Sequence, residues 1–407
     1  MKLWNLYKGR DYKIEPTLER IREASDYVGN PQRNYPALLV GGTNGKGSSC
    51  AFLERILREH GLKTGWFVSP HLVDERERWR IKGRWIEEET LEWYVKELKG
   101  IFERFNLTYF EAATLIALLY FRDEGVDVAV MEVGMGGRWD ATKVSSAQVV
   151  GITNVERDHT KWLGNNVEEI AEDKLHLYRE GTPLVLGNAR YPLYPKALEM
   201  GLGNLVVAGE DYTYRGYVRK GRTFLEEYSF MDTNLREAQL GLLGKWQIDN
   251  AAFALTMAGL FMGIKEDKTR EALRLTRWEG RMEVVREDPL LILDGSHNPY
   301  AVNKVVKEVR RLFPEVRFLF TGLREKEWEL SMSLIRKYTD SIFLVQVSHH
   351  RGEPVTNLYR KAVDMGFKEI VVFETPADAW KCPENLCAVG SLYLIGEIKE
   401  AFADTVI

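Results

Sequence analysis

The chain has 407 residues, which at ~150 residues per domain favours two domains and allows three. Hydrophobic residues make up 45% and aromatic residues 11%, so the composition excludes a disordered or low-complexity protein. The 56 basic and 60 acidic residues leave a formal net charge of −4, which gives no support to bulk binding of nucleic acid or of a membrane surface.

The cysteines and the apolar runs indicate the cellular compartment in which the protein is expected. Cys50, Cys382 and Cys387 show no pattern of paired spacings, and free thiols suit a reducing compartment. The first residues, MKLWNLYKGRDYKIEP, are too polar for a signal peptide, and no apolar run approaches the ~18 residues of a membrane span. We therefore expect a cytoplasmic protein. Scarce glutamine beside abundant Lys, Arg and Glu also suggests a thermophilic source.

Strands alternate with helices along the first half of the chain. We expect strands at 36–40, 64–68, 126–131, 148–153 and 183–186, and helices at 50–61, 91–105, 110–124 and 167–178. The apolar strands are nearly continuous, as expected for a sheet covered on both faces. This alternation predicts an α/β fold with a mostly parallel sheet.

The second half of the chain interrupts this rhythm and then resumes it. Residues 204–230 are rich in Tyr, Val and Phe with polar alternation, which predicts inserted antiparallel hairpins, and a long helix follows at 247–262. Alternation returns with strands at 290–293, 316–320, 342–345 and 370–373 and a final helix near 390–401. We expect an α/β domain over 1–280, which the glycine-rich loop at 39–49 makes a P-loop-type ATPase domain. A linker at 281–288 and a smaller Rossmann-like α/β domain over 289–407 follow.

A glycine-rich loop lies between the first strand and the first long helix. In residues 39–49, LVGGTNGKGSS, glycines let backbone N–H groups turn toward an anion, and the helix N-terminus adds partial positive charge. Lys46 supplies a cation for phosphates and Ser48 a hydroxyl near a metal. The loop departs from a strict Walker A motif, because Val40 replaces the first glycine and Gly47 separates Lys46 from Ser48. A plain tight turn is the alternative; the lysine and the context favour nucleotide binding.

The loop GTNGKGS resembles the nucleotide loop of the folylpolyglutamate synthase/dihydrofolate synthase branch of the Mur ligase superfamily. The resemblance continues in order along nearly the whole chain. Its further segments are SPHL (69–72), ER (77–78), TYFE (108–111), EVGMGGRWDAT (132–142), DH (158–159), LG (163–164), Lys174, Gly244, Gln247, Asn250, GR (280–281), DGSHNP (294–299) and GSLY (390–393).

The resemblance implies ATP-dependent amide formation. ATP phosphorylates a carboxylate, and the amine of L-glutamate attacks the acyl phosphate. The implied partners are ATP, Mg²⁺, L-glutamate and a folate or dihydropteroate, and we expect a monomer that binds neither nucleic acid nor membrane. The residues implied to bind ATP are Thr43, Asn44, Gly45, Lys46, Gly47, Ser48, Asn250, Arg281 and Asp294.

Glu132 ends an apolar strand, which places its carboxylate at the sheet edge where ligands bind in open α/β folds. Mg²⁺ prefers such hard oxygen ligands. The resemblance implies that Ser69, Glu132 and His159 are magnesium ligands. A solvated strand-end carboxylate and a structural histidine are the alternatives.

Lys174 lies inside a predicted helix. The resemblance implies that this lysine is carbamylated and becomes an oxygen ligand, which first requires a neutral amine. Its flanks depart from the family, because Asp173 stands where Glu is usual and Leu175-His176 replace Ala-Gly. A solvated helix lysine is the alternative. We assign Lys46, Lys174 and His297 to catalysis, the last to the placement of glutamate or the acyl phosphate.

Two segments resemble the family's pterin-binding segments. They are Thr108, Tyr109, Phe110 and Glu111, and Trp139, Asp140 and Ala141. Aromatic faces suit a flat pterin, and carboxylates suit its ring N–H donors. Core packing is the alternative for Tyr109 and Phe110. Lys143 stands where the family has Asn, beside this predicted pterin loop.

We therefore expect a ligase that adds L-glutamate to tetrahydrofolate, to dihydropteroate or to both. One alternative is a Mur-type ligase for another carboxylate, such as a UDP-sugar; Phe110-Glu111 and the SPHL segment favour folate. The other is a non-catalytic nucleotide switch. Asn303-Lys304-Val305-Val306 lacks the Asp of a guanine-reading motif, which argues against a GTPase.

Overall fold

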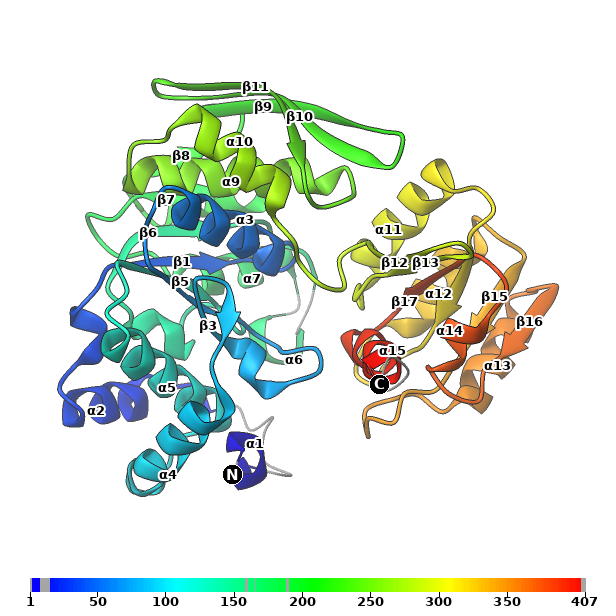
Figure 1. Cartoon of the computed structure of the whole chain (residues 1–407), viewed down its shortest axis with the longest axis horizontal. Helices are drawn as coiled ribbons and strands as arrows, with labels where there is room; N and C mark the ends of the chain where they lie inside the picture. The colour runs from blue at the N-terminus through cyan, green and yellow to red at the C-terminus, as the bar shows by residue number, and fades with distance from the viewer. Residues whose placement is uncertain (1, 8–14, 158–159, 165, 188–189, 404–407) are drawn as a thin grey trace. The chain divides into compact units, whose positions relative to one another are not determined.

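A computed structural model of the chain describes residues 2–7, 15–157, 160–164, 166–187 and 190–403. It forms two compact units (Figure 1). Unit 1 comprises Met1–Tyr217, Phe224–Gly241 and Trp246–Thr276. Unit 2 comprises Val218–Thr223, Leu242–Lys245 and Arg277–Ile407.

An eight-stranded sheet forms the centre of unit 1. Its strands are β1 (Ala37–Gly41), β2 (Thr64–Phe67), β3 (Trp79–Ile81), β4 (Arg84–Trp85), β5 (Val128–Glu132), β6 (Ala147–Ile152), β7 (Leu184–Leu186) and β8 (Leu205–Val207). Their order is β4-β3-β2-β5-β1-β6-β7-β8, parallel from β2 to β8, with β3 and β4 antiparallel at one edge. Every residue of β1 and β5 is buried, which confirms the predicted mostly parallel sheet.

Helices cover both faces of this sheet (Figure 1). They are α1 (Leu3–Tyr7), α2 (Glu19–Tyr27), α3 (Lys46–Glu59), α4 (Glu88–Arg104), α5 (Tyr109–Asp123), α6 (Thr160–Leu163), α7 (Val167–Leu175), α8 (Arg190–Glu199), α9 (Trp246–Phe261) and α10 (Glu266–Leu275), with 3₁₀ turns η1 (Pro31–Arg33), η2 (Glu75–Arg78) and η3 (Ala141–Val144). Helix α3 packs against α9 and α10 on one face, and α5 packs on the other with α2 and α4. The carboxyl ends of the parallel strands are thereby left to carry loops.

The inserted hairpins differ from the prediction at both ends. Leu205–Val207 pairs with β7 and completes the large sheet, so the insertion begins later than residue 204. It consists of β9 (Tyr212–Arg219), β10 (Arg222–Phe230) and β11 (Thr233–Leu240), in the order β11-β10-β9. Strand β11 was not predicted, because Glu237 has a left-handed φ of 50° and breaks the alternation of buried residues.

Unit 2 holds a six-stranded sheet. Its strands are β12 (Glu283–Glu287), β13 (Leu290–Leu293), β14 (Arg317–Phe320), β15 (Ser341–Leu344), β16 (Glu369–Val372) and β17 (Leu386–Val389), in the order β12-β13-β17-β14-β15-β16. Its helices are α11 (Pro299–Leu312), α12 (Trp328–Arg336), α13 (Val355–Asp364), α14 (Asp378–Lys381) and α15 (Leu392–Ala403). The sheet is parallel except for β12, which fits the Rossmann-like fold expected.

Two strands of unit 2 were missed in the sequence. Residues 281–288, expected as a linker, contain β12, an edge strand that pairs antiparallel with β13. Its sequence EVVRE is short and mostly polar, as an edge strand with one unpaired side allows. It therefore lacks the apolar run by which the other strands were predicted. Strand β17 lies in the middle of the sheet although it has only four residues.

Within the described ranges, none of the helices combines the length and the apolar character that crossing a bilayer requires.

Candidate active site

The glycine-rich loop joins β1 to α3 and needs glycine at two positions. Gly42 and Gly45 have left-handed φ values of 133° and 86°. A Cβ on Gly42 would lie 2.0 Å from Thr153 Oγ1, and one on Gly45 would lie 2.4 Å from Asn250 Oδ1. The loop is therefore pressed against the end of β6 and against α9, and a larger residue at either position would displace it.

Hydrogen bonds to the segment after β6 fix the loop backbone. Thr43 N donates to Asn154 O and Asn44 N donates to Asn154 Oδ1, each at 3.0 Å. Thr153 Oγ1 donates to Asn44 O at 2.7 Å. Thr43 and Asn44 thus hold the loop in shape before α3. The first turn of α3, which carries Gly47 and the buried Ser48, points its N-terminal N–H groups into this loop.

Two lysines converge on one carbonyl of the loop. Lys46 Nζ, from α3, donates to Gly42 O at 3.1 Å and to Thr43 O at 3.3 Å. Lys174 Nζ, from α7, donates to Gly42 O at 3.2 Å. Lys174 is only 3% exposed, so it is no solvated helix lysine. Two cations at a glycine-rich helix N-terminus form a site for a phosphate chain.

Ser69 and Glu132 lie at the ends of the neighbouring strands β2 and β5. The parallel register sets Glu132 beside Val40, directly before the glycine loop. The Glu132 carboxylate is buried, and its Oε2 accepts from Ser69 N at 3.3 Å. Ser69 Oγ is buried and has no hydrogen-bond partner in the described part of the chain. A buried hydroxyl without a protein partner is able to bind an ion, a water molecule or a ligand.

These two oxygens fit a hard cation. A carboxylate and a hydroxyl, one of them with free lone pairs, are the donor types that Mg²⁺ takes in proteins. His159, the third predicted metal ligand, lies outside the described residues, as does Asp158. The magnesium assignment of Ser69, Glu132 and His159 therefore stays a prediction.

Asn250 supports the loop from α9. Its Nδ2 donates to Gln247 Oε1 at 2.9 Å, and its Oδ1 accepts from Ser49 Oγ at 3.4 Å. The amide is nearly buried and lies against Gly45. The structure therefore places this predicted ATP residue at the glycine loop.

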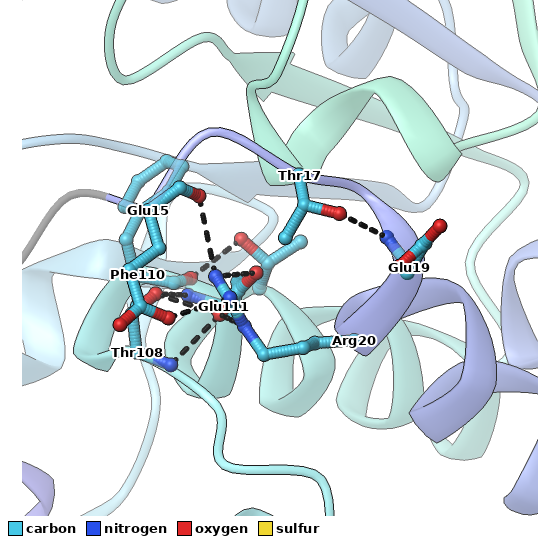
Figure 2. A network of polar contacts seen from close by, with 8 residues as sticks. Glu15, Thr17, Glu19, Arg20, Thr108, Phe110 and Glu111 are labelled. Atoms are coloured by element: carbon cyan, nitrogen blue, oxygen red, sulfur yellow. Dashed lines mark hydrogen bonds and ion pairs between the residues drawn. The ribbon is translucent and has the colours of Figure 1, made fainter.

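Thr108 and Glu111 form a capping box at the start of α5 (Figure 2). Thr108 Oγ1 accepts from Glu111 N at 3.3 Å, and Glu111 Oε2 accepts from Thr108 N at 2.8 Å. Arg20 on α2 also donates to both carboxylate oxygens of Glu111, at 3.1 and 3.0 Å. Both residues thus have a structural role that the sequence analysis missed, although T-x-x-E before an apolar run is the signal for it.

The two aromatic residues between them have different surroundings. Tyr109 is 4% exposed, its hydroxyl donates to Glu75 Oε1 at 2.9 Å, and its ring meets Trp4 edge-on. Tyr109 therefore packs in the core, as its alternative interpretation expects, and its contact with a pterin stays a prediction. The ring of Phe110 lies over Gly134, where a Cβ would be 2.6 Å from Cζ. Phe110 therefore borders the loop that follows β5.

Asp140 organises that loop. Its Oδ2 accepts from Gly134 N and Met135 N, each at 3.0 Å, and its Oδ1 accepts from the N and Oγ1 of Thr142. Burial raises the pKa of the Asp140 carboxyl, against the effect of these donors. All its usual acceptor sites are occupied within the loop. Next to it Trp139 is 50% exposed, whereas Ala141 is buried.

In unit 2, Arg281, Asp294 and His297 gather at the carboxyl end of β13. The buried Asp294 accepts from Met282 N and Ser296 N, each at 2.9 Å. Burial raises the pKa of Asp294, and the Arg281 guanidinium acts in the opposite direction. A Cβ on Gly295 would meet Arg281 Nη1 at 2.8 Å, and His297 Nδ1 lies 3.2 Å from Gly295 O.

Comparison with known proteins gives the family. Two family descriptions match: "Mur ligase middle domain" over residues 40–258 and "Mur ligase, glutamate ligase domain" over residues 280–395. The chain is 30% identical to the folylpolyglutamate synthase of Lacticaseibacillus casei, over 92% of this chain and 91% of that protein.

Another relative is longer. The probable bifunctional folylpolyglutamate synthase/dihydropteroate synthase of Haloferax volcanii is 30% identical over 99% of this chain. The chain spans about half, 50%, of that protein's length.

A solved structure agrees with these relatives. It is the bifunctional folylpolyglutamate synthase/dihydrofolate synthase of Yersinia pestis complexed with AMPPNP and Mn ion. It superposes with a TM-score of 0.87 at 27% identity, covering 99% of this chain and 98% of that one. The chain belongs to the folylpolyglutamate synthase/dihydrofolate synthase family of Mur ligases.

Proposed function

We propose that the chain is an ATP-dependent ligase that joins L-glutamate to the carboxyl group of tetrahydrofolate, of dihydropteroate or of both. The observation that carries the proposal is the meeting of Lys46 and Lys174 at Gly42 O, beside Ser69 and Glu132. Family membership supports it, as does the Yersinia pestis relative, which is complexed with AMPPNP and Mn ion.

In this proposal the glycine loop holds the triphosphate. The N–H groups of the loop and of the first turn of α3 surround the phosphates, and Lys46 balances their charge. Ser69, Glu132 and His159 would hold Mg²⁺, which when bound supplies further positive charge to the phosphates.

The reaction has two steps. The folate carboxylate oxygen attacks the γ-phosphorus, ADP leaves, and an acyl phosphate forms. The glutamate amine then attacks the acyl carbon, loses a proton and expels phosphate, which leaves an amide. The chain's contribution is positioning and charge balance, because several anions must meet in one place. We propose that Arg281 and Asp294 bind the nucleotide and that His297 positions glutamate or the acyl phosphate.

Lys174 has a second proposed state. Carbamylation of its Nζ would replace a cation by a carboxylate-like group near Gly42 O, able to bind a divalent ion. Because carbamylation consumes CO₂, activity should fall in CO₂-free buffer and return when bicarbonate is added. An activity independent of bicarbonate, with an unmodified lysine in the electron density of active crystals, would reject this state.

The substrate segments enter the proposal in two roles. Phe110 and the half-exposed Trp139 offer aromatic faces to a flat pterin. Thr108, Tyr109, Glu111, Asp140 and Ala141 shape the backbone around those faces. We also propose a cytoplasmic location, since the three cysteines are free, and a monomer, which a mass measurement in solution tests.

One assay tests the function. The enzyme is given ATP, Mg²⁺ and L-glutamate with dihydropteroate or tetrahydrofolate, and products are resolved by mass. We expect phosphate release that needs both glutamate and pterin, with a product heavier by one glutamate residue. Nucleotide binding without phosphate release would indicate a switch. Phosphate release with a UDP-sugar acid and with no pterin would indicate another Mur-type ligase.

A further inference from the structure

Five basic side chains gather beside the loop that follows β5, and we call them the basic cluster. They are Arg22 on α2, Arg138 in the loop, Lys143 on η3, and His176 and Arg179 just after α7. Neither the ATP residues nor the predicted magnesium ligands include any of them. Lys143 and His176 are also positions where the sequence departs from the family pattern.

Direct contacts hold four of the five in one place. Arg179 Nη2 donates to Lys143 O at 3.3 Å, which joins the segment after α7 to η3. Arg138 Nη2 contacts His176 Nε2 and lies 3.3 Å from Glu172 Oε1. The loop rests closely on α7, because a Cβ on Gly137 would be 2.7 Å from the carbonyl oxygens of Asp173 and Lys174. Helix α2, which carries Arg22, packs against η3.

The positive charges exceed the negative charges that face them. Burial, followed by Arg22, Arg179 and Arg138, lowers the pKa of Lys143, and Asp173 acts in the opposite direction. Two carboxylates of α7 face the cluster. Glu172 pairs with Arg138, and the carboxylate of Asp173 lies against Gly136.

Within the described part of the chain, Lys143 has no ion pair to offset this repulsion. Its ammonium makes no hydrogen bond or ion pair with any residue that the structure describes, and Glu172 pairs with Arg138. The carbonyls at the C-terminus of α7 attract cations and account for His176, its C-cap residue. They do not account for Lys143, which lies on another element.

Two carboxylates of the predicted pterin segments are already hydrogen-bonded, so they have little capacity left to accept from a cationic ligand. Asp140 already accepts four hydrogen bonds within the loop. Glu111 is paired with Arg20 and with the N-terminus of α5. Among the groups that face the cluster, Arg22, Arg138, Lys143 and Arg179 therefore outnumber the carboxylates of Glu172 and Asp173. Positively charged donors recognise carboxylates and phosphates.

We propose that the basic cluster binds an anionic group of the substrate, separate from the carboxyl group that the ligase activates. The inference rests on the proposed function and defines its substrate class as pterins with an additional carboxylate or phosphate. Two sources of this charge fit the chemistry. One is the set of α-carboxylates in a γ-glutamate tail already on the folate; the other is an acidic substituent on the pterin itself.

Kinetics with two substrates test the tail as the source. Dihydropteroate has no carboxylate besides the reacting one, whereas tetrahydropteroyl-tri-γ-glutamate has several. In Lys143→Gln we expect the ratio of kcat/KM for the tri-glutamate to that for dihydropteroate to fall roughly tenfold, the effect of one lost charge-assisted contact. The matched control is Lys99→Gln, an exposed lysine of α4 near Glu103, which should leave the ratio unchanged.

Equilibrium binding tests the pterin as the source. Calorimetry compares 6-carboxypterin with the neutral 6-hydroxymethylpterin at low and high salt, in the wild-type chain and in Lys143→Gln. If the acid is on the pterin, 6-carboxypterin binds more tightly, loses this advantage in high salt and loses it in Lys143→Gln. The kinetic ratio then stays constant while the binding difference falls.

The outcomes separate the two proposals. An unchanged ratio together with equal binding of the two pterins overturns the inference, whether or not kcat/KM falls equally for both substrates. If the wild-type chain makes no glutamylated product, the proposed function fails. Calorimetry still decides the basic cluster in that case, because it needs no turnover. Binding of tetrahydropteroyl-tri-γ-glutamate against dihydropteroate then tests the tail, and the two pterins test the acidic substituent.

Discussion

The glycine-loop edge of the sheet and the two predicted pterin segments differ in how their polar groups are used. At the glycine loop, Ser69 Oγ is buried without a hydrogen-bond partner in the described chain, and two ammonium groups share Gly42 O. In the pterin segments, the carboxylates of Glu111 and Asp140 are already engaged by neighbouring backbone and side chains. The polar groups of the first region suit a ligand, as we propose, whereas those of the second hold their own loops.

This difference shows what a motif can encode. A glycine-rich turn leaves N–H groups and a lysine exposed to an anion, so its residue types reflect the ligand directly. Thr108 and Glu111 instead satisfy the orphan N–H groups of α5, and Asp140 closes a turn. Their contact with a pterin stays a prediction, and the structure favours an indirect role through the position of Phe110 and Trp139.

The largest expected effect lies at the glycine loop. Lys46→Ala removes a cation that balances the transferring phosphoryl group, and we expect a loss of turnover of roughly a thousandfold or more. Phosphate release is the measurement, with Lys99→Ala as the exposed-lysine control. The unfolding midpoint should change little, since among the described residues Lys46 Nζ donates only to the carbonyl oxygens of Gly42 and Thr43 in its own loop. Full activity in Lys46→Ala would remove the loop from the mechanism.

A second change tests the predicted metal ligands. Ser69→Ala and Glu132→Gln each remove a hard oxygen or its charge, and we expect the Mg²⁺ concentration for half-maximal activity to rise roughly tenfold or more. Mg²⁺ titrations of activity measure this. Raising Mg²⁺ should restore turnover of Ser69→Ala. A lowered maximal rate with an unchanged Mg²⁺ requirement would argue for a role other than metal binding.

Substitution of Glu111, in the first predicted pterin segment, should lower the stability of the fold. Glu111→Ala removes the capping box and leaves the half-buried Arg20 without this partner, so we expect the free energy of unfolding to fall by roughly 2–4 kcal/mol. Urea unfolding measures this fall. Arg20→Ala and the double variant complete a cycle that isolates the pair. A raised KM for the pterin without loss of stability would show instead that Glu111 contacts the substrate directly.

Much of the fold follows from the sequence, and the exceptions have physical causes. The apolar runs of β1, β5 and β6 predict buried parallel strands because both faces of the sheet are covered. Strand β12 is an edge strand of mixed polarity, and β11 contains a left-handed residue, so neither shows the alternation expected of a strand. In each, tertiary pairing and not local pattern decides the structure.

In the candidate site, too, some features follow from the local sequence and others depend on tertiary packing. The glycine loop, Glu132 and Lys174 lie together at one sheet edge, as their motif order predicts. The repulsion around Lys143 could not be read from the sequence, because its neighbours come from α2, the loop after β5 and the segment after α7. Contacts between distant segments depend on packing, which no local spacing reports.

The smallest expected effect separates two residues of one motif. In SPHL, Ser69 belongs to the predicted metal site, whereas His71 Nδ1 accepts from Arg78 Nε at 2.9 Å. Burial, and then the Arg78 charge, lowers the pKa of His71 to about 3.

The sign of its pH effect follows from this pKa. Below pH ~6.5, the unfolded chain binds a proton at His71, whereas the folded chain binds it only near pH 3. The stability contributed by the neutral side chain is therefore fully present above pH ~6.5 and is lost as the pH falls toward 3. We expect up to about 1 kcal/mol of lost stability per pH unit in that window. The measurement compares urea unfolding of the wild-type chain and His71→Gln at pH 7 and 5.5. The wild-type chain should lose more stability, since glutamine does not titrate. Equal losses would show that His71 is protonated in the fold, and its assignment as a neutral acceptor for Arg78 would be wrong.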